Sequence, residues 1–217
     1  MERQLEDIAT ATLAKYGMPL PVDIYRLCIR MKYDVRLGEP GSRPTVLGRT
    51  IFVTPEEPEE RQRFAAAHEL AHMIMRALGL SISESEKHAN WLASALLHPE
   101  AWFLERLAAR GWDLAALKTD CRWSSYEAIG RRIVSLQPAV LWVCDRGPGV
   151  RKGYRVASRG LVARHKKPTR IEWKLVRDAA ASLQPQVIAG VGAWPLPSPE
   201  HEWLRVVSLA RADAIAM

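Results

Sequence analysis

The most strongly patterned segment of the chain is RQRFAAAHELAHMIMRAL, residues 61–78. Apolar residues recur there at intervals of three and four positions, which predicts a helix with one buried stripe. The stripe contains Phe64, Ala67, Ala71, Ile74, Met75 and Leu78. His68 and His72 fall on or beside it, where an imidazole without a partner costs on the order of 1 to 3 kcal/mol. A metal ion shared by the two histidines is one explanation for their position.

The pattern elsewhere predicts an α+β protein. Besides the helix that starts near Pro58, helices are expected at 2–16, 21–32, 83–97, 100–110, 113–120, 124–136 and 169–183, and extended segments at 33–37 and 45–53. From Pro138 onward the sequence changes to short β-like runs such as AVLWVC, separated by Gly and Pro. We therefore expect a mainly helical domain at 1–137 with a small sheet, and a small mixed α/β region at 138–217.

Composition places the chain among ordinary soluble proteins. It has 217 residues, of which 48% are hydrophobic and 25% charged, and no apolar run of about 18 residues that could span a bilayer. The N-terminus MERQLEDIATATLAKYG is charged and has no apolar core, so a secretory signal is not expected. Cys28, Cys121 and Cys144 form no CxxC pair. These features together predict a cytoplasmic protein without disulfide bonds.

The net charge of +7 is concentrated in one stretch. Between Arg146 and Arg177 eleven basic residues face a single acid, Glu172, so this stretch alone contributes +10 and the rest of the chain is slightly acidic. Such a segment could bind nucleic acid or an acidic protein surface. A solvated basic face that binds nothing explains the composition equally well.

The spacing in HELAH is suited to metal chemistry. Residues i and i+4 of a helix differ by about 40° in azimuth, so His68 and His72 can reach one ion at roughly 2.0 to 2.1 Å. Glu69 projects to one side of that ion, where a carboxylate can take a proton from a metal-bound water that attacks a carbonyl, and pass it to the leaving amine. The motif thus predicts a hydrolase, although a five-residue pattern also arises by chance.

A catalytic zinc site usually has three protein ligands, so a further one is needed. The next helical segment, SESEKHANWLASALLHP, offers Glu86 at the front of its apolar stripe. A capping box, with Ser83 as N-cap and Glu86 three residues later, accounts for the same residue without a metal, and the spacing does not decide between the two. His88 is expected on the surface, and His98 at a helix end.

These motifs resemble the ImmA/IrrE family of intracellular metallopeptidases. The resemblance rests on RQRFAAAHELAHMIM, on ExxAN at 86–90 with LASALLHP after it, on LPVDIYRLCIRMKYDVR, and on WDLAALKTDCRWSSYEAIGRRIVSL, and it covers about residues 15–137. It implies a zincin-like core with His68, His72 and Glu86 as ligands of Zn²⁺, or alternatively Mn²⁺, and Glu69 as general base. Trp91-Leu92 and His98 depart from the family pattern.

The resemblance also implies a function. Family members typically cleave a helix-turn-helix transcriptional repressor at one site and thereby induce a mobile element or a stress response, so we expect a site-specific endopeptidase. The competing hypothesis is a non-catalytic regulatory or antitoxin-like module that binds a protein or DNA partner. The helix pair at 113–136 resembles a helix-turn-helix, although such pairs are also common packing units. Nonspecific DNA contact through the basic stretch is a further hypothesis, and Tyr33 and His165 are candidates for stabilising the oxyanion.

Overall fold

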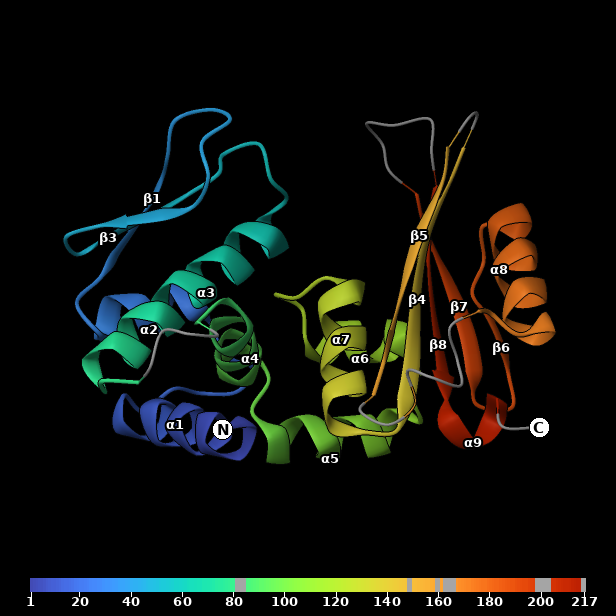
Figure 1. Cartoon of the computed structure of the whole chain (residues 1–217), viewed down its shortest axis with the longest axis horizontal. Coiled ribbons are helices and arrows are strands. Elements are labelled where there is room, and N and C mark those ends of the chain that lie inside the picture. Colours follow the sequence, from blue (N-terminus) through green and yellow to red (C-terminus); the bar gives the residue numbers. More distant parts are fainter. Residues whose placement is uncertain (81–84, 148–149, 159–160, 162–166, 198–203, 216–217) are drawn as a thin grey trace. The chain divides into compact units, whose positions relative to one another are not determined.

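Figure 1 shows a computed structural model of the chain, which describes all residues except 81–84, 148–149, 159–160, 162–166, 198–203 and 216–217. The chain forms two compact units. The first consists of residues 1–109 and 119–125, and the second of residues 110–118 and 126–217. The fold is α+β, as the sequence predicts, with helices and a small sheet in the first unit and a larger sheet in the second.

The first unit is a helical core beside a three-stranded sheet. Its helices are α1 (Glu2–Lys15), α2 (Ile24–Arg30), α3 (Glu59–Ala77), α4 (Ser85–Leu97) and α5 (Glu100–Arg110), and its strands are β1 (Asp34–Leu37), β2 (Thr45–Leu47) and β3 (Thr50–Val53). These elements confirm the predicted segments to within a few residues. Helix α2 starts later than predicted because Asp23 caps it, accepting a hydrogen bond from the Tyr25 backbone N–H at 3.1 Å.

The predicted extended segment at 45–53 is a hairpin and not one strand. Gly48 and Arg49 form a two-residue turn between β2 and β3, and Gly48 has φ +60° at the first turn position, as a type II′ turn requires. Strand β3 lies in the middle of the sheet, parallel to β1 and antiparallel to β2. Strand β2 is therefore an edge strand.

Helix α3 buries four of the six residues predicted for its stripe, Ala67, Ala71, Ile74 and Met75, and adds Ala66 and Leu70. Phe64 is only half-buried, and Leu78 is exposed beyond the helix end. The alanines of α3 pack in the same core cluster as Ala89 and Ala93 of α4. Small side chains let the two helices approach closely, which shifts the contact face toward them.

The family departure at Trp91-Leu92 is absorbed by packing within the first unit. The Trp91 indole Nε1 donates a 2.8 Å hydrogen bond to the carboxylate of Glu6, a buried residue of α1. Leu92 is fully buried in the same core. These two residues therefore fix α4 against α1 without touching the predicted ligands.

A buried arginine fixes the start of α3. The Arg63 guanidinium lies between the rings of Tyr25 and Trp123, at 4.4 and 4.0 Å from their centroids. It also pairs with Asp23 at 2.7 Å and with Glu59 at 2.9 Å. Planar stacking and a fork of donors suit arginine and not lysine. This contact joins the turn at 121–125 to α2 and α3.

The second unit has an antiparallel sheet with one helix on each face (Figure 1). The strand order is β5-β4-β8-β7-β6. The strands are β4 (Ala139–Gly147), β5 (Val150–Ala157), β6 (Gln186–Ile188), β7 (Val191–Pro197) and β8 (Leu204–Arg211), and the helices are α6 (Leu114–Asp120, which begins in this unit), α7 (Tyr126–Leu136), α8 (Arg170–Ser182) and α9 (Ala212–Ile215). Both faces of β4 are buried, which explains its nearly continuous apolar run.

Helix α7 packs closely on this sheet. A Cβ at Gly130 would lie 2.6 Å from the Leu141 Cδ1 atom, so a larger residue there would force the Leu141 side chain to shift. The sequence analysis placed this helix in a domain that ends at residue 137. A division into compact units does not test a division into domains. The predicted domain boundary at residue 137 therefore stays a prediction.

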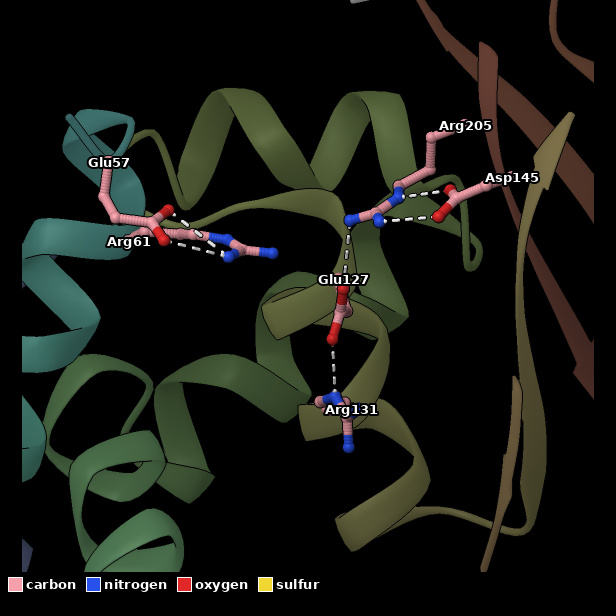
Figure 2. A network of polar contacts seen from close by, with 6 residues as sticks. All are labelled: Glu57, Arg61, Glu127, Arg131, Asp145 and Arg205. Atoms are coloured by element: carbon pink, nitrogen blue, oxygen red, sulfur yellow. Dashed lines mark hydrogen bonds and ion pairs between the residues drawn. The ribbon is translucent and has the colours of Figure 1, made fainter. Parts of the chain in front are cut away.

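The exposed side of α7 is occupied by ion pairs. Glu127 pairs with Arg131 at 2.9 Å and with Arg205 at 3.6 Å, and Arg205 forms a two-pronged contact with Asp145 at 2.7 and 2.9 Å (Figure 2). Burial, followed by a hydrogen bond with Glu127, raises the pKa of Tyr154 in the same network to about 12. Helix α7 thus directs its charged groups at its own sheet, which favours a packing role over one in reading DNA.

Arg132 of α7 lies differently from what its sequence pattern predicts. The apolar stripe of Ile129, Ile133 and Leu136 predicts that Arg131 and Arg132 point away from the core, yet Arg132 is 1% exposed. The apolar stripe alone does not show that a charged side chain beside it is buried in the folded protein.

Part of the basic stretch is neutralised internally. Glu172, its single acid, is fully buried, forms a capping box with Thr169 at the start of α8, and pairs with Arg155 at 2.9 Å. Lys174 and Arg177 both contact Asp178. The stretch therefore includes structural charges as well as solvated ones.

Two further expectations concern the whole chain. Among the described residues no helix is both long enough and apolar enough to cross a bilayer. Cys28, Cys121 and Cys144 are all buried and free. Burial raises the pKa of the Cys28 thiol to about 12, so this residue is a core residue and not a nucleophile.

Candidate metal centre

Helix α3 presents the two histidines of HELAH on one side. The His68 and His72 Nε2 atoms lie 3.1 Å apart, and the two ring planes are nearly perpendicular. Both side chains are partly buried, with 17% and 23% of their surfaces exposed. The i, i+4 spacing thus brings two nitrogen lone pairs to one point beside the apolar stripe.

Glu86 reaches the same point from α4. Its two carboxylate oxygens lie 3.3 Å from His68 Nε2 and 3.2 Å from His72 Nε2. The three potential ligand atoms all fall within 4.8 Å of one another. Ser83, the partner that a capping box needs, lies outside the described residues. The carboxylate position matches that of a metal ligand.

Asn90, one turn after Glu86 on α4, orients the first histidine. Its Oδ1 atom lies 3.0 Å from His68 Nδ1. Because this amide oxygen is an acceptor, the neutral imidazole carries its proton on Nδ1 and presents a lone pair at Nε2. Metal-binding histidines are usually held by such a second contact, which fixes the tautomer and the ring orientation.

The donor set fits a small divalent cation. Two ligand atoms, each roughly 2.0 to 2.1 Å from a tetrahedral zinc, lie about 3.3 Å apart. The separations of 3.1 to 3.3 Å are close to that value, with the two distances to Glu86 measured to its two different carboxylate oxygens. Two nitrogens and a carboxylate are also the ligand types of hydrolytic zinc sites. Without an ion, a proton shared between the imidazoles and Glu86 would be needed to hold the same groups together.

Glu69 lies beside the three ligands and not among them. It is half-buried, and this burial raises the pKa of its carboxyl group, with a smaller contribution in the same direction from the charge of Glu86. Positive charge on His68 and His72 acts in the opposite direction. A carboxylate with a raised pKa accepts a proton more readily than a solvated one, which suits a general base.

These groups open onto a groove of about 910 Å³ in the first unit. One wall comes from β2 and its flanks, and the other from α3, with Glu86 of α4 added. The lining residues are Arg43, Pro44, Thr45, Val46, Gly48, Phe64, Ala65, His68, Glu69, His72, Met73, Arg76 and Glu86. A groove of this size can hold several residues of an extended peptide.

Other residues considered from the sequence lie elsewhere. Tyr33 does not line the groove, and its ring lies beside the Arg49 guanidinium at 5.5 Å. His88 is half-buried outside the groove, and His98 is 2% exposed against the Phe103 ring. His165 lies outside the described residues. The oxyanion-stabilising group is therefore not identified by these candidates.

The sequence analysis missed three residues of this region. Asn90 follows Glu86 by four positions, and Arg76 follows His72 by four, so helical spacing alone could have placed both on the site face. Arg43 has no such signal, because it comes from the loop before β2.

Comparisons with known proteins address the family and the fold. Residues 30–134, nearly half of the chain, match the model of Peptidase M78, the IrrE N-terminal-like domain. A solved structure described as a Mycobacterium tuberculosis transcriptional regulator superposes with a TM-score of 0.66 over 98% of this chain and 77% of that one, at 15% identity, which indicates a shared fold. A search of curated proteins found no match. The match of residues 30–134 to the IrrE N-terminal-like domain of Peptidase M78 therefore supports an assignment to the ImmA/IrrE family.

Proposed function

We propose that this chain is a divalent-metal-dependent endopeptidase. The observation that carries the proposal is the convergence of His68, His72 and Glu86, with Glu69 next to them, at the floor of a groove. The match to a peptidase family supports the same reaction class.

In this proposal His68, His72 and Glu86 hold the ion, Zn²⁺ or alternatively Mn²⁺. When bound, such an ion polarises a peptide carbonyl and lowers the pKa of water. Asn90 keeps the His68 proton on Nδ1 and so leaves Nε2 available. Glu69 takes a proton on a carboxylate oxygen and returns it to the nitrogen of the leaving amine.

We further propose that the substrate is a helix-turn-helix transcriptional repressor, cut at a single site in the cytoplasm. The resemblance to ImmA/IrrE proteins is the main support. The description of the structural neighbour as a transcriptional regulator is compatible with a role in gene control. The groove is long enough for an extended segment and open to solvent, as cleavage of another protein requires.

The test combines the purified chain with a candidate substrate, a small helix-turn-helix repressor, chosen from a gene adjacent to its own where one is found. We expect one cut, detected by mass spectrometry of the fragments, which stops with a chelator and resumes on addition of Zn²⁺ or Mn²⁺. An intact repressor under all metal conditions would contradict the proposal.

The competing hypothesis, a non-catalytic regulatory or antitoxin-like binding module, makes a different prediction in cells. If cleavage is the mechanism, Glu69→Gln should fail to derepress the target genes, although it still binds the repressor. Derepression equal to that of the parent chain would support the binding module.

Nonspecific DNA contact through Arg146–Arg177 stays a prediction. Arg155 is held by Glu172, so fewer charges are free than the composition indicates. If the contact exists, affinity for duplex DNA should fall steeply with salt concentration.

A further inference from the structure

Strand β2 exposes backbone groups to the groove. In a hairpin closed by two residues, the Leu47–Thr50 pair exchanges its hydrogen bonds, and the next pair, Val46–Ile51, does not. The Val46 N–H and C=O groups therefore point to the open edge, with which no described strand pairs. Because Val46 lines the groove, an extended peptide in it could bond to this edge.

Two arginines of the groove lack partners. Arg43 and Arg76 are both exposed, and neither forms an ion pair or hydrogen bond with any residue that the structure describes. Several other arginines of the same unit are engaged, namely Arg36 with Asp34, Arg61 with Glu57, and Arg63 with Asp23 and Glu59. The unengaged guanidinium groups are thus available to a ligand.

Charge in the groove favours an anionic ligand. Among the described residues that line it, the acidic ones are Glu69 and Glu86, and Glu86 is a ligand in the proposed metal site. With a divalent ion in place, the formal charge of the groove becomes positive, and Arg43 and Arg76 bring that charge to two separate walls. Arg76 also lies in the last turn of α3, where a positive charge is favourable to the helix dipole. This local reason for a basic residue does not apply to Arg43, which is not in a helix.

We propose that the groove binds an extended, acidic peptide segment, and that Arg43 and Arg76 are the residues that select it. This inference rests on the proposed peptidase function and specifies its substrate class. The segment adds to the edge of β2 through backbone hydrogen bonds at Val46, and its Asp or Glu side chains pair with the two guanidinium groups.

A single-stranded nucleic acid could also pair with the two arginines, but it fits the groove less well. Its phosphates would be repelled by the Glu69 carboxylate, which lines the groove. A nucleic acid also lacks the regular series of N–H and C=O groups that pairs with a strand edge. Among the described lining residues, Phe64 is the one aromatic side chain outside the proposed metal ligands His68 and His72, and it is half-buried, so these residues offer no row of rings on which bases could stack.

Binding is measured on the 217-residue chain with Glu69→Gln, loaded with Zn²⁺, so that cleavage is slow compared with the measurement. The probes are two fluorescein-labelled ten-residue peptides, one with alternating Glu and Val and one with Gln in place of each Glu. We expect the acidic peptide to bind more tightly, and Arg43→Gln or Arg76→Gln to weaken it by about two- to fivefold each, as for exposed ion pairs. The difference should shrink at high salt.

Arg26→Gln is the matched control. Arg26 is exposed on α2, has no partner among the described residues, and lies outside the groove, so its loss changes the net charge equally. Equal affinity for the two peptides, no binding of either, or an equal effect of Arg26→Gln would overturn the inference. So would tighter binding of a single-stranded oligonucleotide of the same charge that depends on Arg43 and Arg76.

Cleavage by the parent chain separates this inference from the proposed function. A mixed peptide pool is digested and the sequences around each cut are determined. We expect acidic residues to be enriched near the cuts, and Arg43→Glu with Arg76→Glu to reverse the preference. Cuts without acidic enrichment refute the inference alone. Selective binding of the acidic peptide without any cut refutes the peptidase and leaves the selectivity standing.

Discussion

His68 Nδ1 and Asn90 Oδ1 lie 3.0 Å apart, in a contact that joins α3 to α4 directly behind the candidate metal centre. The ring orientation of the histidine therefore depends on a neighbouring helix as well as on its own. Loss of such a second contact typically lowers metal affinity by about ten- to a hundredfold.

Asn90→Leu should accordingly weaken metal binding by that factor, whereas Asn90→Asp, which retains an acceptor oxygen, should bind metal at least as well as the parent. Competition with a chromophoric chelator measures both affinities. If Asn90→Leu binds zinc as tightly as the parent, the orienting role is wrong.

The ligand set predicts metal content. His72→Ala removes one of three protein ligands, so the purified variant should lose most of the roughly one equivalent of metal expected in the parent. Elemental analysis checks this, and full occupancy in His72→Ala would exclude the assignment.

Glu86→Gln distinguishes a ligand from a helix cap. A glutamine side chain can still form a capping box, but it is a much weaker metal ligand than a carboxylate. We expect metal affinity to fall while helicity by circular dichroism is unchanged. If Glu86→Gln binds metal as tightly as the parent chain, Glu86 is a helix cap and not a ligand.

Glu69→Gln should separate metal binding from turnover. The carboxylate lies beside the three ligands, so metal content and fold should be retained. General acid and base groups contribute about 10²- to 10⁴-fold to the rate, and we expect a loss of that size in the initial rate of cleavage of the purified repressor. A loss below tenfold would argue against Glu69 as the general base.

Arg63 should contribute much more to stability than its neighbour Arg61. Arg63→Met removes two ion pairs and both aromatic contacts, and because Asp23 and Glu59 are partly exposed we expect a cost of about 1 to 3 kcal/mol. Arg61 is an exposed residue whose pair with Glu57 is drawn in Figure 2, so Arg61→Met should cost less than about 0.5 kcal/mol. Urea unfolding monitored by circular dichroism compares the two variants.

Gly192 should tolerate no side chain. A Cβ there would lie 2.1 Å from the Trp194 indole, so Gly192→Ala must displace a buried ring, at a cost of about 1 to 3 kcal/mol. Trp194→Leu should remove most of that penalty in the double variant. Thermal unfolding of the parent, the two single variants and the double variant gives the coupling free energy between residues 192 and 194. Additive effects on stability would show that the Trp194 ring is not the obstacle.

The sequence predicted local features well because local chemistry determines them. The α3 helix, a helix beginning near residue 169 and the α+β class all follow from local sequence patterns. His68 and His72 were predicted as ligands from helical spacing, and Glu86 was predicted from the family motif, because spacing alone left it undecided.

Features that depend on contacts between distant segments were not predicted. Arg63 meets Trp123 sixty positions later, and nothing in either segment alone indicates this stack. The edges of the buried stripe of α3 were not predicted, since Phe64 and Leu78 are less buried than expected and Ala66 and Leu70 are buried instead. Arg43 lines the groove only because the hairpin of β2 and β3 folds beside α3, which the local sequence does not indicate.

The placement of two histidines on α3 and of Glu86 on α4 has a thermodynamic consequence. An ion held by all three would cross-link two helices that are separate in the unfolded chain, so its binding free energy would add to the folding free energy. At a thousandfold excess over the dissociation constant this linkage amounts to about 4 kcal/mol. A chelator would then act as a denaturant of the first unit, lowering its midpoint temperature by an amount that depends on the free metal concentration.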